Sequence, residues 1–479
     1  MADTKRFLRI KRETAPYRAV CERVKDYKEV AVLRPDDKSQ EQGSRCMDCG
    51  VPFCHWGCPI GNYIPEWNDL MFRGQWKKAV ESLHATNNLP EITGRLCPAL
   101  CEFSCVLGIN DDPITIRENE LAIIEHAFRE GWIKPEPPKR RTGKKVAVIG
   151  SGPAGLACAD QLNKAGHKVT VFEKDDKPGG ILRYGIPDFK LEKSVIDRRI
   201  KIFKKEGIEF RTSTDVGADY KVSGLKKDFD AVCLTSGSRF PRDLNIPGRE
   251  LKGVYFAMDY LIQSNRRAAG QKIPPARTID AKGKKVVVIG GGDTGSDCVG
   301  TSHRQGAACV VQIELLPQPP ECRTKDCPWP RYPMLLKTSS SHHEGGERRW
   351  AVSTKEFKGR DGCVKGLSCV KVDIGKDDKG RMLIKDIPGT AFEIEADMVI
   401  LALGFIYPEK GLISQLGVEL DPRGNVKADE HYLTSVKDVF AAGDMRRGQS
   451  LIVWAISEGR RAAHSIDKFL MGSTRLPSL

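Results

Sequence analysis

The sequence predicts an α/β protein in which an N-terminal α-helical domain precedes two Rossmann-like dinucleotide-binding domains. Two observations predict the paired domains: a β-branched run followed by a glycine-rich loop and a helix occurs at 145–162 and again at 284–300. A third sets the N-terminal region apart, because seven of the 16 cysteines fall between Cys46 and Cys105, where no glycine-rich phosphate loop occurs. The chain therefore combines two nucleotide sites with one sulfur-rich domain.

The composition excludes several classes of protein. With 479 residues, 40% of them hydrophobic, the chain has the length of about two to four globular domains. No run of 18 apolar residues occurs and the basic start lacks the apolar core of a secretion signal, so we expect a cytoplasmic protein without a membrane span. The formal charge of +14 is dispersed, so we expect no nucleic-acid partner. An anionic dinucleotide or an acidic partner protein accounts for the basic balance.

Changes in pattern divide the chain into segments. Apolar residues recur at helical spacing within 63–83 and 116–128, and a linker rich in Pro and charge follows at 134–143. Strands are expected at 397–403 and 438–442 and a closing helix at 450–470. The segment 317–348 is expected to be a loop with His342 and His343 at its surface. The expected domains are 1–140 (helical), 141–275 and 401–479 (two parts of one dinucleotide domain) and 276–400 (the other dinucleotide domain).

The first glycine loop has the spacing of a dinucleotide site. Gly150, Gly152 and Gly155 form GxGxxG directly after a predicted strand. The first glycine permits the tight turn, the second lets backbone N–H groups approach a pyrophosphate, and the third allows close packing of helix on strand. Glu173 follows the next strand, 23 residues after Gly150, where a carboxylate accepts the ribose hydroxyls of an adenosine. A plain surface turn is the alternative, and the combination of strand, spacing and acid argues against it.

Two later segments point to FAD at this first site. Gly443–Asp444 follows a predicted strand, and in two-dinucleotide flavoproteins of the glutathione reductase type such a pair holds the flavin ribityl chain. Taken alone, Gly-Asp is an ordinary turn signal. The segment 178–187 (PGGILRYGIP) gives the chain a second pass near the cofactor. The candidate cofactor-binding residues here are Gly150, Gly152, Pro153, Ala154, Gly155, Glu173, Lys174, Gly180, Arg183, Lys190, Gly404, Gly443 and Asp444.

The second glycine loop repeats the design. Glu314 ends the strand that follows it, 24 residues after Gly290, and is expected to face the adenine ribose. A carboxylate suits a free 2′-hydroxyl and repels a 2′-phosphate, so NADH is favoured over NADPH. Arg304 or Arg323 could instead fold back to receive such a phosphate. The candidate residues are Gly290, Gly292, Asp293, Thr294, Gly295 and Glu314, of which Asp293 and Thr294 can cap the helix and contact phosphate.

The cysteines of the N-terminal region have the spacing of metal ligands. They are arranged as Cys46-x2-Cys49-x4-Cys54-x3-Cys58 and Cys97-x3-Cys101-x3-Cys105. Zinc and iron–sulfur clusters both use tetrahedral thiolate sites. Cys-Pro pairs, the density of thiolates and the need of a flavin for one-electron relays favour [4Fe–4S]. Two four-ligand clusters need eight donors, so Glu118 or Glu120 could supply the last one, although each is also typical of a solvated helix.

Taken in order along the chain, these features resemble the small (beta) subunit of bacterial glutamate synthase, a family related to the N-terminal half of dihydropyrimidine dehydrogenase. The resemblance covers essentially the whole chain. It includes FLRIKRETAPYR, CMDCGVPFCHWGCP, GRLCPALCEFSC, VIGSGPAGL, GGILRYGIPDFKLEK, PRDLNIPG, GGGDTGSDC and VFAAGDMRRGQSLIVWAISEGR. The segment ELLPQPP at 314–320 is similar to NADH-using plant and fungal members.

The resemblance implies two [4Fe–4S] clusters, FAD, and NADH or NADPH as cofactors. One cluster would be held by Cys46, Cys49, Cys54 and Cys105, and the other by Cys58, Cys97, Cys101 and Glu120. Electrons would pass from the nicotinamide through FAD and the clusters to a large (alpha) subunit that carries FMN and makes glutamate from glutamine and 2-oxoglutarate. Hydride transfer needs no protein nucleophile, so no catalytic side chain is predicted. The alternatives are electron input to a pyrimidine-reducing, ferredoxin-linked or sulfur-reducing enzyme, and a non-catalytic interaction subunit.

Overall fold

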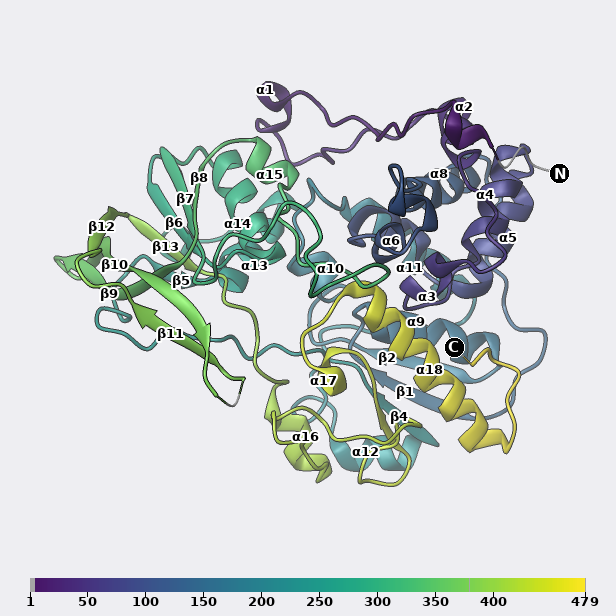
Figure 1. Cartoon of the computed structure of the whole chain (residues 1–479). Coiled ribbons are helices and arrows are strands. Elements are labelled where there is room, and N and C mark those ends of the chain that lie inside the picture. The colour runs from purple at the N-terminus through teal and green to yellow at the C-terminus, as the bar shows by residue number, and fades with distance from the viewer. Residues whose placement is uncertain (1–4, 379, 479) are drawn as a thin grey trace.

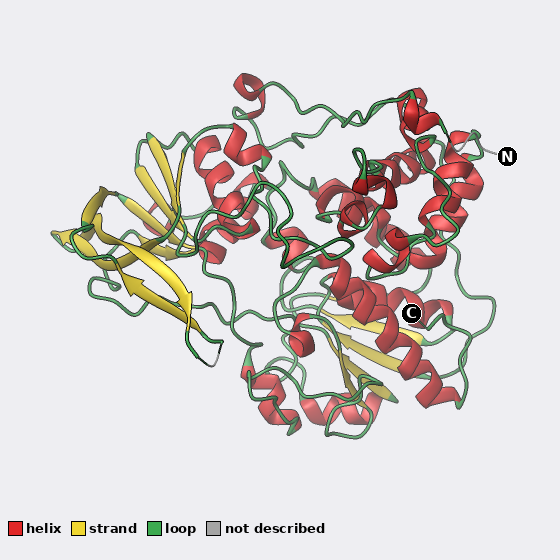
Figure 2. Ribbon diagram, in the orientation of Figure 1, coloured by secondary structure: helices red, strands yellow, loops and turns green. Residues whose placement is uncertain are grey.

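A computed structural model describes residues 5–378 and 380–478. It contains a helical N-terminal part and two units that are each built on a parallel sheet (Figures 1 and 2). We call these the cysteine domain, the first dinucleotide unit and the second dinucleotide unit. Within the described residues, no helix is both long enough and apolar enough to cross a membrane.

The cysteine domain is a bundle of short helices around Trp67, Met71, Ile123 and Ile124, which are all fully buried. The segment predicted as helical at 63–83 forms two helices, because the chain turns at Gly74, whose φ is +71°. The helices are α2 (Asp36–Gly43), α3 (Phe53–Gly57), α4 (Ile64–Phe72), α5 (Trp76–Thr86), α6 (Pro90–Leu96), α7 (Leu100–Phe103) and α8 (Ile116–Arg129), with short 3-10 turns at η1 (Arg6–Leu8) and η2 (Val106–Ile109). Helix α1 (Val20–Arg23) lies apart from this bundle, beside the second dinucleotide unit (Figure 1).

The first dinucleotide unit has a five-stranded parallel sheet with helices on both faces. Val146 and Val148 of its central strand enter one core, and Ala147 and Ile149 enter the other, because successive side chains of a strand point to opposite faces. The strand order is β14 (Val439–Ala441), β4 (Ala231–Leu234), β1 (Lys145–Ile149), β2 (Lys168–Phe172) and β3 (Glu209–Arg211). One core contains residues of α9 (Pro153–Lys164), α11 (Lys193–Lys205) and α18 (Ile452–Met471), and the other those of α12 (Val222–Asp228) and α16 (Lys410–Leu416).

The second dinucleotide unit also has a five-stranded parallel sheet. The strand order is β5 (Val254–Phe256), β13 (Met398–Leu401), β6 (Lys285–Ile289), β7 (Cys309–Ile313) and β8 (Glu347–Arg349), and α13 (Ala257–Ala268) and α14 (Asp293–Arg304) pack on one face. The chain therefore enters this sheet at Val254 and not at the expected boundary of residue 276. A strand of three residues is too short to show a periodic pattern.

An antiparallel sheet covers the other face of the second unit. It consists of β9 (Val352–Arg360), β10 (Cys363–Lys376), β11 (Met382–Asp386) and β12 (Phe392–Glu395), and Phe357 and Leu367 are buried against the parallel sheet. This layer was not predicted. The expected loop at 317–348 was partly wrong too, because it contains α15 (Ser340–His343) and most of β8. The sequence of β8 is Glu-Arg-Arg, which carries no apolar signal. A short 3-10 turn, η3 (Pro275–Arg277), completes the unit.

Candidate functional site

The first glycine loop joins β1 to α9 and leaves room for a phosphate. Gly150 has a φ of +103°, and a Cβ on Gly155 would lie 2.0 Å from the carbonyl oxygen of Gly150, so neither position accepts a side chain. A Cβ on Gly152, by contrast, would meet no atom within 4 Å. The N-terminus of the 12-residue α9 therefore faces open space, where its N–H groups and positive dipole end can receive an anion.

Glu173 is held against this loop from the end of β2. Its Oε2 accepts hydrogen bonds from the backbone N–H of Ser151 (3.2 Å) and the Ser151 hydroxyl, and its Oε1 accepts one from the N–H of Asp175 (2.9 Å). The side chain of Thr235 donates to the carbonyl oxygen of Gly150 at 3.0 Å and fixes the turn from the other side. Neither Ser151 nor Thr235 was predicted, because Ser151 occupies a variable position within the pattern and Thr235 follows a different strand, β4.

The later glycines return to the same loop. A Cβ on Gly180 would lie 3.0 Å from Cα of Gly152, and a Cβ on Gly443 would lie 2.8 Å from Cβ of Ala154. The N–H of Gly443 donates to the buried Glu458 at 2.9 Å, another contact that sequence analysis missed. Gly404 lies against Gln449, on the segment that leads from α17 (Asp444–Arg447) to α18. The structure thus brings segments 150–155, 178–187 and 443–444 together.

Asp444 begins α17 and is largely shielded from water. It accepts a hydrogen bond from the Ser450 hydroxyl at 2.7 Å. Burial raises the pKa of Asp444 to about 6, against a usual value of 3.8. A carboxyl group in this position can accept a hydroxyl hydrogen bond, and so it fits a polyol chain.

The three cationic candidates of the first site are all engaged with the protein. Lys174 pairs with Glu409 at 2.6 Å. Arg183 donates to the carbonyl oxygen of Pro178 at 2.6 Å and pairs with Asp197, and Lys190 pairs with Asp297 on α14. Their contacts hold neighbouring segments together, which is a structural task that the sequence pattern does not distinguish from cofactor binding.

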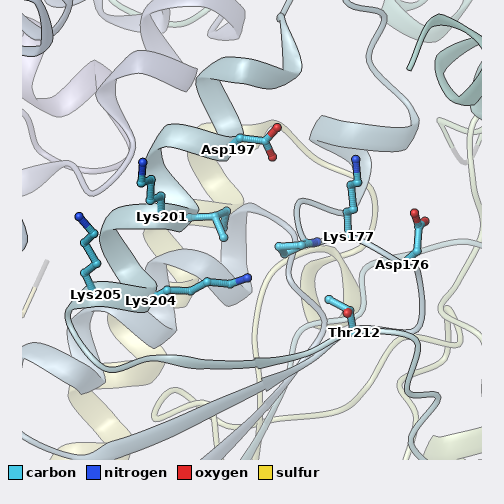
Figure 3. A pocket seen from close by; sticks show the side chains of 9 residues that line it. Asp176, Lys177, Asp197, Lys201, Lys204, Lys205 and Thr212 are labelled. Carbon is cyan, nitrogen blue, oxygen red and sulfur yellow. The ribbon is translucent and has the colours of Figure 1, made fainter. Parts of the chain in front are cut away.

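A basic hollow of about 480 Å³ lies beside this site. Figure 3 shows its lining, in which Lys177 faces the lysines of α11 across the opening. The lining residues are Asp176, Lys177, Pro178, Asp197, Ile200, Lys201, Lys204, Lys205 and Thr212. None of the predicted cofactor-binding residues lines this hollow, so it lies next to the site and not within it.

The second glycine loop repeats the backbone geometry of the first. Gly290 has a φ of +122°, a Cβ on Gly295 would lie 2.2 Å from the carbonyl oxygen of Gly290, and a Cβ on Gly292 would meet no atom within 4 Å. Glu314 follows β7 directly and accepts hydrogen bonds from the N–H groups of Gly291 and Leu316. Asp293 is exposed and Thr294 half-buried at the N-terminus of α14. This loop therefore also fits the pyrophosphate and ribose of a dinucleotide.

His342 supports this second loop from behind, which corrects its expected place at the surface. The amide of Gln312 donates to the carbonyl oxygen of Gly290 at 2.8 Å, and its oxygen lies 2.8 Å from Nε2 of His342. Nδ1 of His342 accepts the N–H of Ser339, so Nε2 carries the proton and donates to Gln312. Burial lowers the pKa of His342 to about 4. The signal available in the sequence was Gln312, a polar residue within an otherwise apolar strand.

Both arginines that were weighed as receivers of a 2′-phosphate are engaged elsewhere. Arg304 pairs with Glu344 through two hydrogen bonds, at 2.6 and 3.0 Å. Arg323 donates to the carbonyl oxygens of Phe103 and Cys327, and so it faces the cysteine domain. Glu314 therefore lies beside the loop without either of these cations.

The seven clustered cysteines form two groups in space. Four of them line a small cavity of about 20 Å³ together with the apolar side chains of Ile64 and Ile116: these are Cys46, Cys49, Cys54 and Cys105. Burial, together with the charges of the neighbouring Cys105 and Cys49, raises the pKa of Cys46 to about 12. Thiols so close that their charges interact are suited to share one cationic group.

The second group consists of Cys58, Cys97 and Cys101 with Glu120. Burial, together with the charges of Glu120 and Cys58, raises the pKa of Cys97 to about 12. Burial also raises the pKa of Glu120 to about 8, and its Oε1 accepts hydrogen bonds from Asn87 (3.0 Å) and Thr93.

Glu118 faces the other way. It accepts the N–H of Ala15 at 2.8 Å and lies 3.5 Å from Arg34. Of the two carboxylates considered, Glu120 is thus the one beside the cysteines. Each group supplies four anionic donors, which fits a [4Fe–4S] cluster. Among the described residues, no three His, Cys, Asp or Glu side chains lie close enough together to hold a single metal ion.

Comparison with known families agrees with this architecture. The profile described as pyridine nucleotide-disulphide oxidoreductase matches residues 144–459, and the profile described as dihydropyrimidine dehydrogenase domain II, 4Fe-4S cluster, matches residues 23–132. The solved structure of FprA from Mycobacterium tuberculosis is similar in fold, with a TM-score of 0.56 and 20% identity over 69% of this chain and 85% of FprA. The fold and sites thus define a pyridine-nucleotide oxidoreductase with an added iron–sulfur domain. Its cofactors are FAD, NAD(P)H and [4Fe–4S].

Its relatives identify the family within this class. The chain is 53% identical to the glutamate synthase [NADPH] small chain of Mycobacterium tuberculosis over 100% of this chain and 98% of the relative. It is 47% identical to the corresponding small chain of Bacillus subtilis, over 98% and 99%. Glutamate synthase [NADH] of Schizosaccharomyces pombe is 49% identical over 98% of this chain, which spans only 23% of that protein. The chain belongs to the glutamate synthase small-chain family.

Proposed function

We propose that the chain is the electron-input subunit of a glutamate synthase. It would bind and oxidise NADH at the second glycine loop. The electrons would then pass to FAD at the first loop and to clusters at the two cysteine groups. Their destination would be a large subunit that carries FMN and forms glutamate from glutamine and 2-oxoglutarate. When bound, FAD accepts a hydride and the clusters accept electrons singly. The protein residues supply binding, orientation and exclusion of water.

The position of the second cysteine group carries this proposal. Cys58 and Cys97 pack against the same core that contains Val146 and Val148 of β1, so this group adjoins the first dinucleotide unit. The Ser457 hydroxyl of α18 donates to the carbonyl oxygen of Pro59 at 2.7 Å, directly after Cys58. The group of Cys46, Cys49, Cys54 and Cys105 follows on the far side. This order provides a relay that leads from the first unit into the cysteine domain.

The coenzyme we propose is NADH. Glu314 is anionic and hydrogen-bonded at the loop, and Arg304 and Arg323 are bound elsewhere, so a 2′-phosphate would meet a negative charge. The relatives carry both names, NADPH in the bacterial small chains and NADH in the fungal proteins. The residues around Glu314 are therefore a better guide than the names.

A large partner is supported by the fungal relatives, in which a segment like this chain is joined to a much longer remainder. We place the protein in the cytoplasm, because all 16 cysteines, which lie within the described residues, are free.

Activity of the anaerobically purified chain tests the proposal. The chain should reduce an artificial electron acceptor with NADH and should form glutamate only after a glutamate synthase large subunit is added. Absence of oxidation of both NADH and NADPH by flavin- and iron-loaded protein would refute the electron-input role, and oxidation of NADPH alone would refute only the choice of coenzyme. Electron delivery to a pyrimidine reductase or a ferredoxin, without glutamate formation with the large subunit, would support a different partner.

A further inference from the structure

The N-terminal region sends a hairpin across to the second dinucleotide unit. Residues 16–32, called here the N-terminal hairpin, pair through the N–H of Arg18 with the carbonyl oxygen of Val30 and through that of Val32 with Pro16, both at 2.9 Å. A half-buried ion pair between Arg18 and Asp26 closes it internally. Helix α1 forms its tip and lies next to α15, away from the bundle of the cysteine domain (Figure 1).

Arg23 at the tip enters a buried network of three charges. Its Nε lies 2.7 Å from Glu344, and Glu344 also pairs with Arg304 of α14 at 2.6 Å. The side chains of Arg23, Glu344 and Arg304 are 3%, 0% and 0% exposed. Arg23 further donates to the carbonyl oxygen of Ser340 at 2.8 Å. A buried charge is stable only where partners of opposite charge and hydrogen-bonding groups surround it, so the tip of the hairpin has one defined binding position, at residues 339–344.

The segment that receives Arg23 also supports the second glycine loop. Within residues 339–344, His342 bonds Gln312, which holds the carbonyl oxygen of Gly290. The Ser339 hydroxyl lies 2.6 Å from that of Ser296 in the first turn of α14. The same six residues, 339–344, thus bind the tip of the hairpin and hold the second glycine loop in place.

The base of the hairpin is fixed to the rest of the molecule. The N–H of Val30 donates to the carbonyl oxygen of Phe189 at 2.9 Å, and the Arg304 guanidinium stacks over the Phe189 ring at 3.8 Å. Glu29 accepts the N–H of Glu192 at 3.0 Å and pairs with Arg95 of the cysteine domain at 2.7 Å. The hairpin therefore contacts all three parts of the protein.

We propose that the N-terminal hairpin positions the second glycine loop relative to the first dinucleotide unit, with Arg23 as a positioning residue that acts through Glu344 and His342. A loop displaced from this position would bind the dinucleotide less tightly, and a loss of binding with unchanged chemistry raises KM and leaves kcat unchanged. This inference rests on the proposed assignment of the second loop to NADH.

Substitution of Arg23 tests this role. In Arg23→Ala, Glu344 keeps Arg304, so the fold has a remaining partner for its buried carboxylate. The KM for NADH should rise roughly three- to tenfold, while flavin content and kcat with an artificial acceptor change little. Arg23→Lys should recover part of the loss, because it keeps the charge but not the fork of donors. Arg18→Ala is the matched control, since it breaks a half-buried pair with Asp26 in the same hairpin that does not involve Glu344, and it should leave KM unchanged.

A double-mutant cycle with His342 gives a second measurement, and Arg23→Lys takes the place of Arg23→Ala in this cycle if Arg23→Ala lowers the yield of folded protein. His342→Ala alone should raise KM, and the rise should be smaller in the Arg23→Ala background, because both substitutions act on one path. Additive effects, or equal effects of Arg18→Ala and Arg23→Ala, would overturn the positioning role. If the wild-type protein itself fails to oxidise NADH, the assignment of the second loop fails and not the hairpin alone.

Discussion

The two glycine loops have the same backbone geometry but differ in how the rest of the chain surrounds them. In the first, Ser151 is 0% exposed and Glu173 is 5% exposed, and the segments around Gly180 and Gly443 close over the loop. In the second, Gly291, Gly292 and Asp293 are exposed and Glu314 is half-buried. A closed loop suits a cofactor that stays bound, and an open loop suits one that must exchange at each turnover.

The difference arises outside the repeated motif. The first loop is covered because β14, α17 and α18 return to its sheet from the C-terminal end of the chain. The second loop has no such cover among the described residues and is supported from behind by α15. Equivalent substitutions in the two loops should therefore have unequal effects.

The largest effect is expected from alanine at the third glycine of each loop. The Cβ of Gly155→Ala would lie 2.0 Å from the carbonyl oxygen of Gly150, and that of Gly295→Ala 2.2 Å from Gly290. Overpacking of this kind costs about 1–3 kcal/mol or more. We expect Gly155→Ala to lose most of its flavin, measured by absorbance after anaerobic gel filtration. Gly295→Ala should keep its flavin and lose NADH oxidation. Loss of flavin from both variants would contradict the assignment.

The next comparison is between Glu173 and Glu314, the two acids that are predicted to face an adenosine ribose. Glu173→Ala removes the acceptor for buried donors of Ser151 and Asp175, and unsatisfied donors cost about 1–3 kcal/mol each. Glu314→Ala leaves its donors open to water, so its cost should stay below about 1 kcal/mol. Urea unfolding of the two variants measures the difference. Equal losses of unfolding free energy would show that the two loops are equally closed.

Coenzyme preference should change at one acid only. Glu314→Ser removes the charge that would repel a 2′-phosphate, so the ratio of kcat/KM for NADH to that for NADPH should fall roughly tenfold, equivalent to about 1.4 kcal/mol. Glu173→Ser is the matched control and should leave this ratio unchanged in the molecules that retain flavin. An unchanged ratio in Glu314→Ser would place the discrimination elsewhere.

The smallest effect concerns Asp444, which has no counterpart in the second loop. Its folded pKa of about 6 exceeds the usual 3.8, so the ionised form destabilises the fold above pH 6 and the penalty disappears as the pH falls towards 4. Flavin-free Asp444→Asn should be more stable than the wild type at pH 7.5 by on the order of 1 kcal/mol. The gap in Tm should shrink below pH 6 and close near pH 4. A gap that is constant with pH would exclude ionisation as its cause.

Sequence analysis found the elements that depend on neighbouring residues. Its α/β fold class is confirmed by the family profile and by the two parallel sheets. The two strand–loop–helix patterns and the acids after β2 and β7 were found because each motif lies within about 25 residues of chain. The spacing of the cysteines pointed to metal ligands, but spacing could not divide seven cysteines into two groups. Cys105 lies with Cys46, from which almost 60 residues of chain separate it. Only tertiary packing therefore shows that Cys105 belongs to a different group from Cys101.

Other features depend on contacts between distant segments. Strand β5 pairs with β13, so that Val254 lies beside Val399, but no local sequence pattern predicts this pairing. Arg23 and Glu344 are 321 residues apart in the sequence. His342 was predicted at the surface because its hydrogen bond to Gln312 forms only in the folded chain. Short-range steric and hydrogen-bond preferences depend on residues that are adjacent in the sequence, and they determine where each nucleotide loop forms. Which loop is covered, which cysteines share a site and where the hairpin sits depend on burial of charge and apolar surface across the whole chain, and these energies are defined only once distant segments meet.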